Sequence, residues 1–450
     1  MGAITENPAI VAKATTMVGS SYEEYPIEIN TLFPDDIFCN WKRYNQNGTM
    51  LVSSLTTSEK YLFRGNNLPV LQALFPSFKE KIKLIYIDPP YNTGSSDFAY
   101  KDRLNHTDWL KFIKPRLELA MHLLHREGAI FIQIDDREMP YLKVLCDDIF
   151  GRENFKECIA LKTSSESGVN AINVLRGEQL FRVKEYLLYY TKSSKDHRFN
   201  PLYIKALSCN KNYRFEVRKK GNTYHITNAY KMLSQELFGQ DNLRSITARQ
   251  KRIFHAALEE YCLEHSEHIY SLETNIRKSG EHFKTFAFLN KTKGIVEEYQ
   301  TSDNRIILVY NGGMLTPLKD RIVIENGTKH YGTLVSDFWW DIGSAPATEE
   351  GVILKSKKPE KLLKRIINLC TMPGDIVLDF FLGSGTTAAT SMKMKRRFIG
   401  IEELNYGSND SLQRLSNVIA GDETGISRHT DISWTGGGSF VYAELKTNNK

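Results

Sequence analysis

Apolar runs separated by amphipathic segments recur in two stretches of the chain, residues 61–150 and 358–402. In each stretch, short apolar runs predict buried strands, and apolar positions spaced by three and four predict helices with one buried face. The predicted strands lie at 84–87, 129–134, 376–380 and 397–401, and residues 61–68 predict a short strand that turns into a helix. Strands that alternate with helices are typical of a parallel sheet covered on both faces. The sequence therefore predicts an α/β fold with a doubly wound, Rossmann-like sheet.

The second stretch is too short to form a sheet of its own. Only about fifty residues follow Glu402, which is too few to complete a nucleotide-binding fold. The second stretch must therefore complete its sheet with strands of the first. The two halves of one domain then flank the central residues, where the periodicity is weak and mixed.

Composition narrows the class of protein further. A chain of 450 residues with 41% hydrophobic and 25% charged residues is globular and long enough for two or three domains. No apolar run is long enough to span a membrane, and the first 25 residues lack the pattern of a signal peptide, so we expect a soluble cytoplasmic protein. The six cysteines are scattered without close Cys or His neighbours, which predicts no disulfide framework, no zinc site and no metal.

Asp88, Pro89, Pro90 and Tyr91 directly follow the predicted strand 84–87. At the carboxyl edge of a parallel sheet, these side chains would line a ligand site. The Asp88 carboxylate and a carbonyl held by the prolines are acceptors for the N–H protons of an exocyclic amine on a flat base, and the Tyr91 ring is a surface for that base. This arrangement suits methylation of such an amine. The alternative interpretation is a turn that ends a strand, with Tyr91 as an ordinary half-buried aromatic.

A glycine-containing turn follows the predicted strand 376–380 and opens a helix. Gly383, Ser384, Gly385 and Thr386 form this turn, and Glu402 ends the next strand about 17 residues later. Glycines allow a ligand to approach the backbone, and a carboxylate at that spacing can accept hydrogen bonds from ribose hydroxyls. The pattern fits a nicotinamide site, but its position beside the Asp88 half of the sheet favours a ribose-bearing methyl donor. Residues 92–102 predict a polar loop able to close over a ligand.

Positive charge is concentrated in one central segment. Residues 181–220 contain eleven Lys and Arg against three Asp and Glu, while the whole chain has a net charge of only +6. Tyrosines and phenylalanines are interleaved with the cations, which is the pattern of a nucleic-acid contact surface, although a solvated face is the alternative. The candidate DNA-binding residues are Arg182, Lys184, Lys192, Lys195, Arg198, Lys205, Lys211, Arg214, Arg218, Lys219 and Lys220.

The order of these motifs resembles the beta-class amino-methyltransferases of DNA, most closely the modification (Mod) subunits of type III restriction-modification systems. The resemblance covers residues 66–150 and 337–445. Besides Asp88 to Tyr91 and Asp379 to Thr386, the matching segments are Asn92 to Gly94, Ile134 to Asp136, Lys358 to Leu363 and Trp434 to Tyr442. One departure is Asn66, because the family usually has an acid there, near the adenine of the cofactor.

The resemblance implies transfer of the methyl group of S-adenosylmethionine to N6 of a flipped adenine in double-stranded DNA. Asp88 and the carbonyl of Pro89, supported by Pro90, would hold the amine, and Tyr91 would stack on the base. Lys358 would lie near the methionine carboxylate, and Glu402 would bind the ribose. The other cofactor-binding residues implied are Asn66, Pro359, Asp379, Phe380, Gly383, Ser384, Gly385 and Thr386.

The resemblance also implies a circularly permuted domain organisation. We predict an N-terminal arm over 1–60, a catalytic half over 61–155, an inserted mixed target-recognition region over 156–335, and a cofactor-binding half with a C-terminal extension over 336–450. A homodimer and a restriction (nuclease/helicase) subunit are the implied protein partners. The alternatives left open are N4-cytosine methylation, methylation of RNA or of a protein amide, a DNA-binding specificity subunit without activity, and a nicotinamide oxidoreductase.

Overall fold

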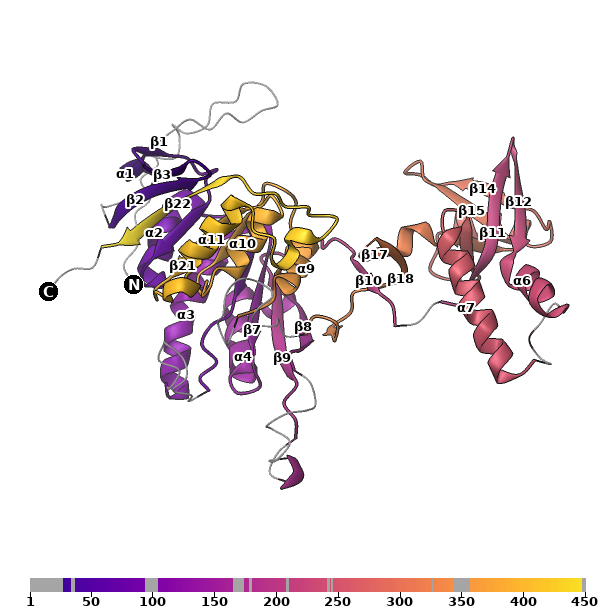
Figure 1. The fold of residues 1–450 in the computed structure, drawn as a ribbon, viewed down its shortest axis with the longest axis horizontal. Helices are drawn as coiled ribbons and strands as arrows, with labels where there is room; N and C mark the ends of the chain where they lie inside the picture. Colours follow the sequence, from indigo (N-terminus) through magenta and orange to yellow (C-terminus); the bar gives the residue numbers. More distant parts are fainter. Residues whose placement is uncertain are drawn as a thin grey trace. The chain divides into compact units, whose positions relative to one another are not determined.

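The computed structural model describes residues 27–33, 37–93, 104–164, 174–177, 180–207, 210–240, 243, 246–325, 327–343 and 357–446. The chain divides into two compact units (Figure 1). One unit combines the residues up to 201 with those from 336 onward, and the other contains residues 202–335. The predicted insertion boundary at 156 is therefore wrong, because residues 156–201 belong to the first unit. The predicted polar loop over 92–102 lies, beyond Thr93, outside the described residues.

Within the described residues, the main sheet of the first unit has the strand order β19-β8-β9-β7-β6-β20-β21-β5-β22-β2-β3. The central strands β7, β6, β20, β21, β5 and β22 run parallel to one another, whereas β9 runs antiparallel to β7 and β8 antiparallel to β9. The bounds are β2 Phe38–Asn45, β3 Gly48–Leu51, β5 Tyr61–Arg64, β6 Ile82–Ile87, β7 Leu124–Ile134, β8 Phe155–Lys162, β9 Lys184–Thr191, β19 Phe338–Trp339, β20 Ile376–Asp379, β21 Arg397–Glu402 and β22 Ser439–Leu445.

The central strands have the spatial order of a nucleotide-binding sheet, but they follow one another along the chain in a circularly permuted order. Along the sheet, β5-β21-β20-β6-β7 corresponds to the order 3-2-1-4-5. Of these five strands the chain forms the third first (β5), then the fourth and fifth (β6 and β7), and after the insertion the first and second (β20 and β21). The prediction of a doubly wound and circularly permuted sheet is confirmed.

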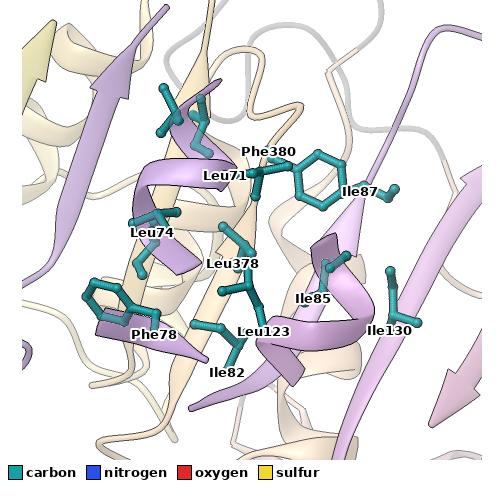
Figure 2. Close-up of a cluster of buried hydrophobic side chains, with 14 of the residues drawn as sticks. Leu71, Leu74, Phe78, Ile82, Ile85, Ile87, Leu123, Ile130, Leu378 and Phe380 are labelled. Atoms are coloured by element: carbon teal, nitrogen blue, oxygen red, sulfur yellow. The ribbon is translucent and has the colours of Figure 1, made fainter. Parts of the chain in front are cut away.

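Helices cover both faces of this sheet (Figure 1). On one face lie α2 (Asn67–Phe78), α3 (His106–Leu123) and α4 (Met139–Phe150), and on the other lie α9 (Glu360–Cys370), α10 (Thr386–Lys393) and α11 (Ser411–Ala420). Side chains alternate along a strand, so the Tyr61 and Phe63 side chains of β5 join the α2 face while Leu62 joins the α10 and α11 face. Figure 2 shows the first of these cores, in which Leu71 and Leu74 pack with strand residues such as Leu378.

The predicted N-terminal arm is wrong for residues 38–55. β2 pairs antiparallel with β22, and β3 pairs with β2. Phe38 is buried against Phe63, with ring centroids 4.9 Å apart. The strands satisfy backbone groups that would otherwise be exposed along the edge of β22. β1 (Ile27–Glu28) and β4 (Ser54–Leu55) form a small separate sheet beside α1 (Ile29–Leu32).

The second unit has mixed elements, as predicted for the insertion. Its described strands form an antiparallel sheet in the order β12-β11-β13-β16-β15-β14 and a smaller one in the order β10-β18-β17. The bounds are β10 Tyr203–Lys205, β11 Tyr213–Lys220, β12 Thr223–Asn228, α6 Ala229–Phe238, α7 Ala248–Glu264, β13 Ile269–Glu273, α8 Glu281–Asn290, β14 Glu297–Gln300, β15 Ile306–Tyr310, β16 Gly313–Pro317, β17 Ile322–Glu325 and β18 Thr328–Leu334. In the described portion of the whole chain, no helix has the length and apolar character needed to cross a membrane.

Candidate active site

The two predicted motifs end neighbouring strands. β6 and β20 pair in parallel, Asp88 directly follows β6, and Asp379 is the last residue of β20. From β6 the chain continues to β7 on one side, and from β20 it continues to β21 on the other. This divergence is the topological switch point of the sheet, where open α/β sheets bind ligands beyond the carboxyl ends of their strands.

Side-chain hydrogen bonds hold the turn that carries Asp88. The indole N–H of Trp109, a fully buried residue of α3, donates to the carbonyl of Pro90 at 2.7 Å. Asn92 adopts a positive φ of 57° and bonds through its side chain to Glu138 at 2.8 Å. Because proline fixes φ on both central residues, this anchoring holds the turn in one conformation. Among the described residues, the carbonyl of Pro89 accepts no hydrogen bond.

Four side chains form a hydrogen-bonded cluster above this turn. The Tyr91 hydroxyl lies 2.6 Å from Oδ1 of Asp88 and 2.8 Å from Oε2 of Glu185. The ammonium nitrogen of Lys358 lies 3.4 Å from Oδ2 of Asp88, 3.0 Å from Oε2 of Glu185 and 2.9 Å from the Tyr91 hydroxyl. It also lies 5.0 Å from the centre of the Tyr91 ring. Two carboxylates thus share one cation and one hydroxyl.

The cluster separates the acidities of its two carboxyl groups. Burial raises the pKa of Asp88, and the charge of Glu185 adds to this effect while Lys358 opposes it. Burial alone would raise the pKa of Glu185, but Lys358 and the donors Gln133 and Tyr91 bring it below its ordinary value. Burial likewise favours a neutral Lys358, but the two carboxylates raise the pKa of its ammonium. Asp88 is therefore the more basic carboxylate of the pair.

Glu185 was not among the predicted site residues. It is the second residue of β9, and because β9 runs antiparallel to β7, this strand begins at the edge where the parallel strands end. The available sequence signal is a single acid, Glu185, directly before the apolar run Tyr186 to Tyr190. Lys358 was predicted near the cofactor's methionine carboxylate, whereas its contacts in the structure are with the Asp88 cluster.

The glycine turn after β20 is tied to the end of β21. The amide N–H of Gly383 donates to Oε2 of Glu402 at 2.6 Å, and the other oxygen of Glu402 accepts from the amide of Leu404 at 2.9 Å. Asp379 accepts from the Thr387 hydroxyl at 2.6 Å and from the amide of Phe381 at 3.0 Å. Burial raises the pKa of Asp379 to about 7 despite these donors.

The two glycines of the turn both have positive φ, 56° for Gly383 and 86° for Gly385. A Cβ atom added at Gly385 would lie 3.1 Å from Cβ of Ser411, whereas one added at Gly383 would meet no atom within 4 Å. Gly385 therefore serves the packing of α10 against α11. Gly383 instead borders open space at the carboxyl edge, where a ligand can approach its backbone.

Other predicted cofactor residues are buried beneath the glycine turn or adjoin the helix next to it. Ser384 and Thr386 are buried, and the Thr386 hydroxyl accepts from the guanidinium of Arg414 at 2.8 Å. Arg414 also donates to Glu360 at 2.8 Å, and Lys393 bonds the same buried carboxylate at 3.1 Å. This ion network joins α9, α10 and α11 beneath the turn. Pro359 is the N-cap residue of α9 and places Lys358 directly before that helix.

Phe380 and Asn66 also have structural contacts. The Phe380 ring is buried in the core, and its carbonyl accepts from the Asn67 amide at 2.6 Å. The buried guanidinium of Arg116 donates to the other end of that amide at 2.6 Å. Asn66 caps α2 and lies 3.3 Å from a carboxylate oxygen of Glu403. The Glu403 carboxylate therefore lies next to position 66, where the family usually has an acid.

The predicted basic surface is divided between the two units. Arg182, Lys184, Lys192, Lys195 and Arg198 belong to the first unit, and Lys205, Lys211, Arg214, Arg218, Lys219 and Lys220 belong to the second. Several of these cations have local partners: Lys184 pairs with Asp136, Arg218 with Glu216 and Lys219 with Glu298, and Lys192 donates to the carbonyl of Met121. Of the interleaved aromatics, Tyr189, Tyr190 and Tyr213 are buried, which makes them core residues instead of a contact surface.

Comparison with known proteins agrees with this geometry. A family model described as DNA methylase matches residues 82–407, a range that contains both edge motifs and the whole second unit. The chain belongs to the DNA methylase family. Membership accounts for the presence of both motifs at one switch point of a permuted sheet.

Relatives of this DNA methylase include proteins of restriction-modification systems. The chain is 37% identical to the probable HindVI Mod subunit of a type III restriction-modification enzyme from Haemophilus influenzae, over 94% of this chain and 59% of that protein. It is 26% identical to the EcoP15I Mod subunit of Escherichia coli, over 89% of this chain and 66% of that protein. It is 28% identical to the type II methyltransferase M.KpnI of Klebsiella pneumoniae, over 80% of this chain and 83% of that protein. The chain thus spans about three fifths of the length of the first two relatives.

Proposed function

We propose that this DNA methylase transfers the methyl group of S-adenosylmethionine to N6 of an adenine flipped out of double-stranded DNA. The observation that carries the proposal is the adjacency of β6 and β20, which brings the carboxylate after one strand beside the glycine turn after the other. An amine acceptor site and a nucleoside site then share one edge. The family model, described as DNA methylase, supports DNA as the substrate.

The residues of the glycine turn fit the methyl donor. The open space beside Gly383 can admit part of a ligand, whereas the space beside the other glycine of the turn is filled. The Glu402 carboxylate, which accepts from the amide of Gly383, can accept further hydrogen bonds from hydroxyl groups. Asn66 and Glu403 lie at the neighbouring strand end. When bound, S-adenosylmethionine supplies an electrophilic methyl group on a sulfonium centre.

The residues of the Asp88 turn would hold the amine. An exocyclic amine is a weak nucleophile because its lone pair is delocalised into the ring, and acceptors for both N–H protons localise that pair. Asp88 would accept one N–H bond and the carbonyl of Pro89 the other, while the Tyr91 ring stacks on the base with about 1–3 kcal/mol. Flipping costs a few kcal/mol, which stacking and these hydrogen bonds partly offset.

Asp88 is also suited to take the proton that the nitrogen loses as the new N–C bond forms. Its raised pKa makes it a better base than an ordinary aspartate, and the Tyr91 hydroxyl contacts it at 2.6 Å. No residue is required to form a covalent bond with the substrate. Catalysis in this account rests on positioning the amine and removing its proton.

The test is methyl transfer to plasmid DNA from S-adenosylmethionine labelled in the methyl group, followed by mass spectrometry of the released nucleosides. We expect labelled N6-methyldeoxyadenosine, and a fall in turnover of about 10²–10⁴-fold in Asp88→Ala with the cofactor affinity retained. Asp148→Asn, an exposed position on α4, is the matched control and should leave turnover unchanged. Labelled N4-methyldeoxycytidine would mean that the target base is cytosine and not adenine. DNA that carries no label would refute the proposal.

Two protein partners are also proposed. A restriction subunit is proposed because relatives of this chain are named as Mod subunits of type III restriction-modification enzymes. A homodimer is proposed on the resemblance alone. Sedimentation of the purified chain, alone and with the restriction subunit of a type III system, would separate these two assemblies from a monomer.

A further inference from the structure

Glu185 competes with Asp88 for the same two donors. The Tyr91 hydroxyl lies within hydrogen-bond distance of both carboxylates, at 2.8 Å from Glu185 and 2.6 Å from Asp88. The Lys358 ammonium is closer to Glu185, at 3.0 Å, than to Asp88, at 3.4 Å. A hydroxyl has one proton to donate, so a bond to one carboxylate is a bond withheld from the other.

This competition matters because Asp88 must have free lone pairs. A carboxylate that accepts from both an ammonium and a hydroxyl has less capacity left for the N–H proton of a substrate amine. A close ion pair with Lys358 would also make Asp88 less basic. In a chain without Glu185, Asp88 would be the remaining carboxylate within reach of Lys358 among the described residues.

Glu185 is held in place independently of Asp88. Nε2 of Gln133 lies 2.5 Å from Oε2 of Glu185, and the Tyr86 hydroxyl donates to the other end of the Gln133 amide at 2.6 Å. Tyr86 and Gln133 are both buried, on β6 and β7. The bond from Tyr86 orients the amide so that its N–H faces Glu185. Pairing of β9 with β7 fixes the backbone of this position as well.

We propose that Glu185 is a positioning residue, which draws the Lys358 ammonium toward itself and so leaves the Asp88 carboxylate available to the target amine. This inference rests on the proposed methyl transfer and deepens it. It assigns to the insertion-proximal strand β9 a part in a site otherwise built from β6 and β20. It also gives Lys358 a place within the amine-binding cluster.

The charged and titratable groups around Glu185 set the expected pH effect. Those that face it or its partners, from every strand and loop of the cluster, are Asp88, Tyr91, Lys358, Tyr86, Asp135 and Asp379. The negative charge of Glu185 raises the pKa of Asp88. Removing that charge lowers the pKa of Asp88, so the acid limb of the turnover profile moves to lower pH.

The test compares Glu185→Gln with the wild-type chain in steady-state methylation of DNA between pH 5 and 9. We expect kcat on the plateau to fall by about 10²-fold, because Lys358 moves onto Asp88 and displaces the amine. KM for S-adenosylmethionine should stay within about threefold of the wild-type value, and the acid limb should move to lower pH. Glu185→Asp, which keeps the charge, should restore part of kcat. Glu127→Gln is the matched control, since the exposed Glu127 pairs with Lys83 at the opposite edge of the sheet.

Three outcomes would overturn the inference: an unchanged kcat, an equal loss of rate at every pH without movement of the acid limb, or no recovery in Glu185→Asp. A wild-type chain that methylates no DNA would refute the proposed function instead. In that case a crystal structure of Glu185→Gln decides the inference separately. A Lys358 ammonium within 3 Å of Asp88 would support it, and one that keeps the 3.4 Å separation would overturn it.

Discussion

Two glycines in one turn are expected to respond differently to the same substitution. Both have positive φ, so an alanine at either position costs about 1–2 kcal/mol of folding free energy from backbone strain. At Gly385 the added methyl would also lie 3.1 Å from Cβ and 3.2 Å from Cα of Ser411, and overpacking of this kind adds about 1–3 kcal/mol. We therefore expect Gly385→Ala to lose about 2–5 kcal/mol and Gly383→Ala about 1–2 kcal/mol.

Binding should show the opposite ranking. The methyl of Gly383→Ala would enter the open space assigned to the cofactor, so this variant should bind S-adenosylmethionine at least tenfold more weakly while it remains folded. Urea unfolding measures the stabilities, and titration calorimetry measures the affinities at a temperature where both variants are folded. Equal losses of stability would refute the contact with Ser411 as the reason. An unchanged affinity in folded Gly383→Ala would refute the placement of the cofactor beside this turn.

Three further predictions concern pH, a buried ion network and DNA binding. Below pH 3.8 both the folded and the unfolded chain keep the Asp379 proton, whereas between pH 3.8 and about 7 only the folded chain keeps it. Raising the pH over this range should therefore lower the free energy of unfolding by up to about 4 kcal/mol. Asp379→Asn should abolish this loss in urea unfolding measured at several pH values. Glu360→Gln leaves the cation of Arg414 buried without its carboxylate and should lose about 3–5 kcal/mol; a loss below about 1 kcal/mol would contradict the importance of this network. Arg214→Gln should lower the slope of log affinity for DNA against log salt by about 1, because Arg214 is exposed. Lys284→Gln, at a half-buried cation paired with Glu281, should leave the slope unchanged, and equal slopes in the two variants would count against the second unit as a DNA-binding surface.

The edge motifs could be predicted from the sequence because each one is local. Asp88 follows an apolar run directly, and Gly383 and Gly385 stand between a strand and a helix. The side of the sheet on which such residues lie follows from chain direction alone. The sharing of one sheet by the two stretches could also be predicted, since only about fifty residues follow Glu402, too few to complete a sheet from the second stretch alone.

Glu185 could not be placed in this way. Its position depends on β9 running antiparallel beside β7, and the direction of a strand cannot be read from its own residues. The run from Lys184 to Thr191 was interpreted as part of a basic surface because its cations and tyrosines stand close together in sequence. In the strand, alternate side chains face opposite ways, so Tyr190 enters the core while Glu185 joins the site.

The N-terminal strands were missed for a related reason. β2 contains polar residues at half of its positions and is stabilised by pairing with β22, which lies about 400 residues later in the chain. Such a long-range pairing has no local pattern. The functional assignments of the eleven predicted DNA-binding cations, which are divided between the two units, stay predictions.

The central claim is that the residues at the shared edge of β6 and β20 methylate one kind of base in DNA. The most direct measurement is single-molecule sequencing with modified-base detection on plasmid DNA incubated with the chain and S-adenosylmethionine, with Asp88→Ala run in parallel. The account predicts N6-methyladenine at one recurring sequence with the wild-type chain and none with the variant. Plasmid DNA that stays unmodified, while the chain binds the cofactor, would contradict the claim, and so would the same modification in both samples.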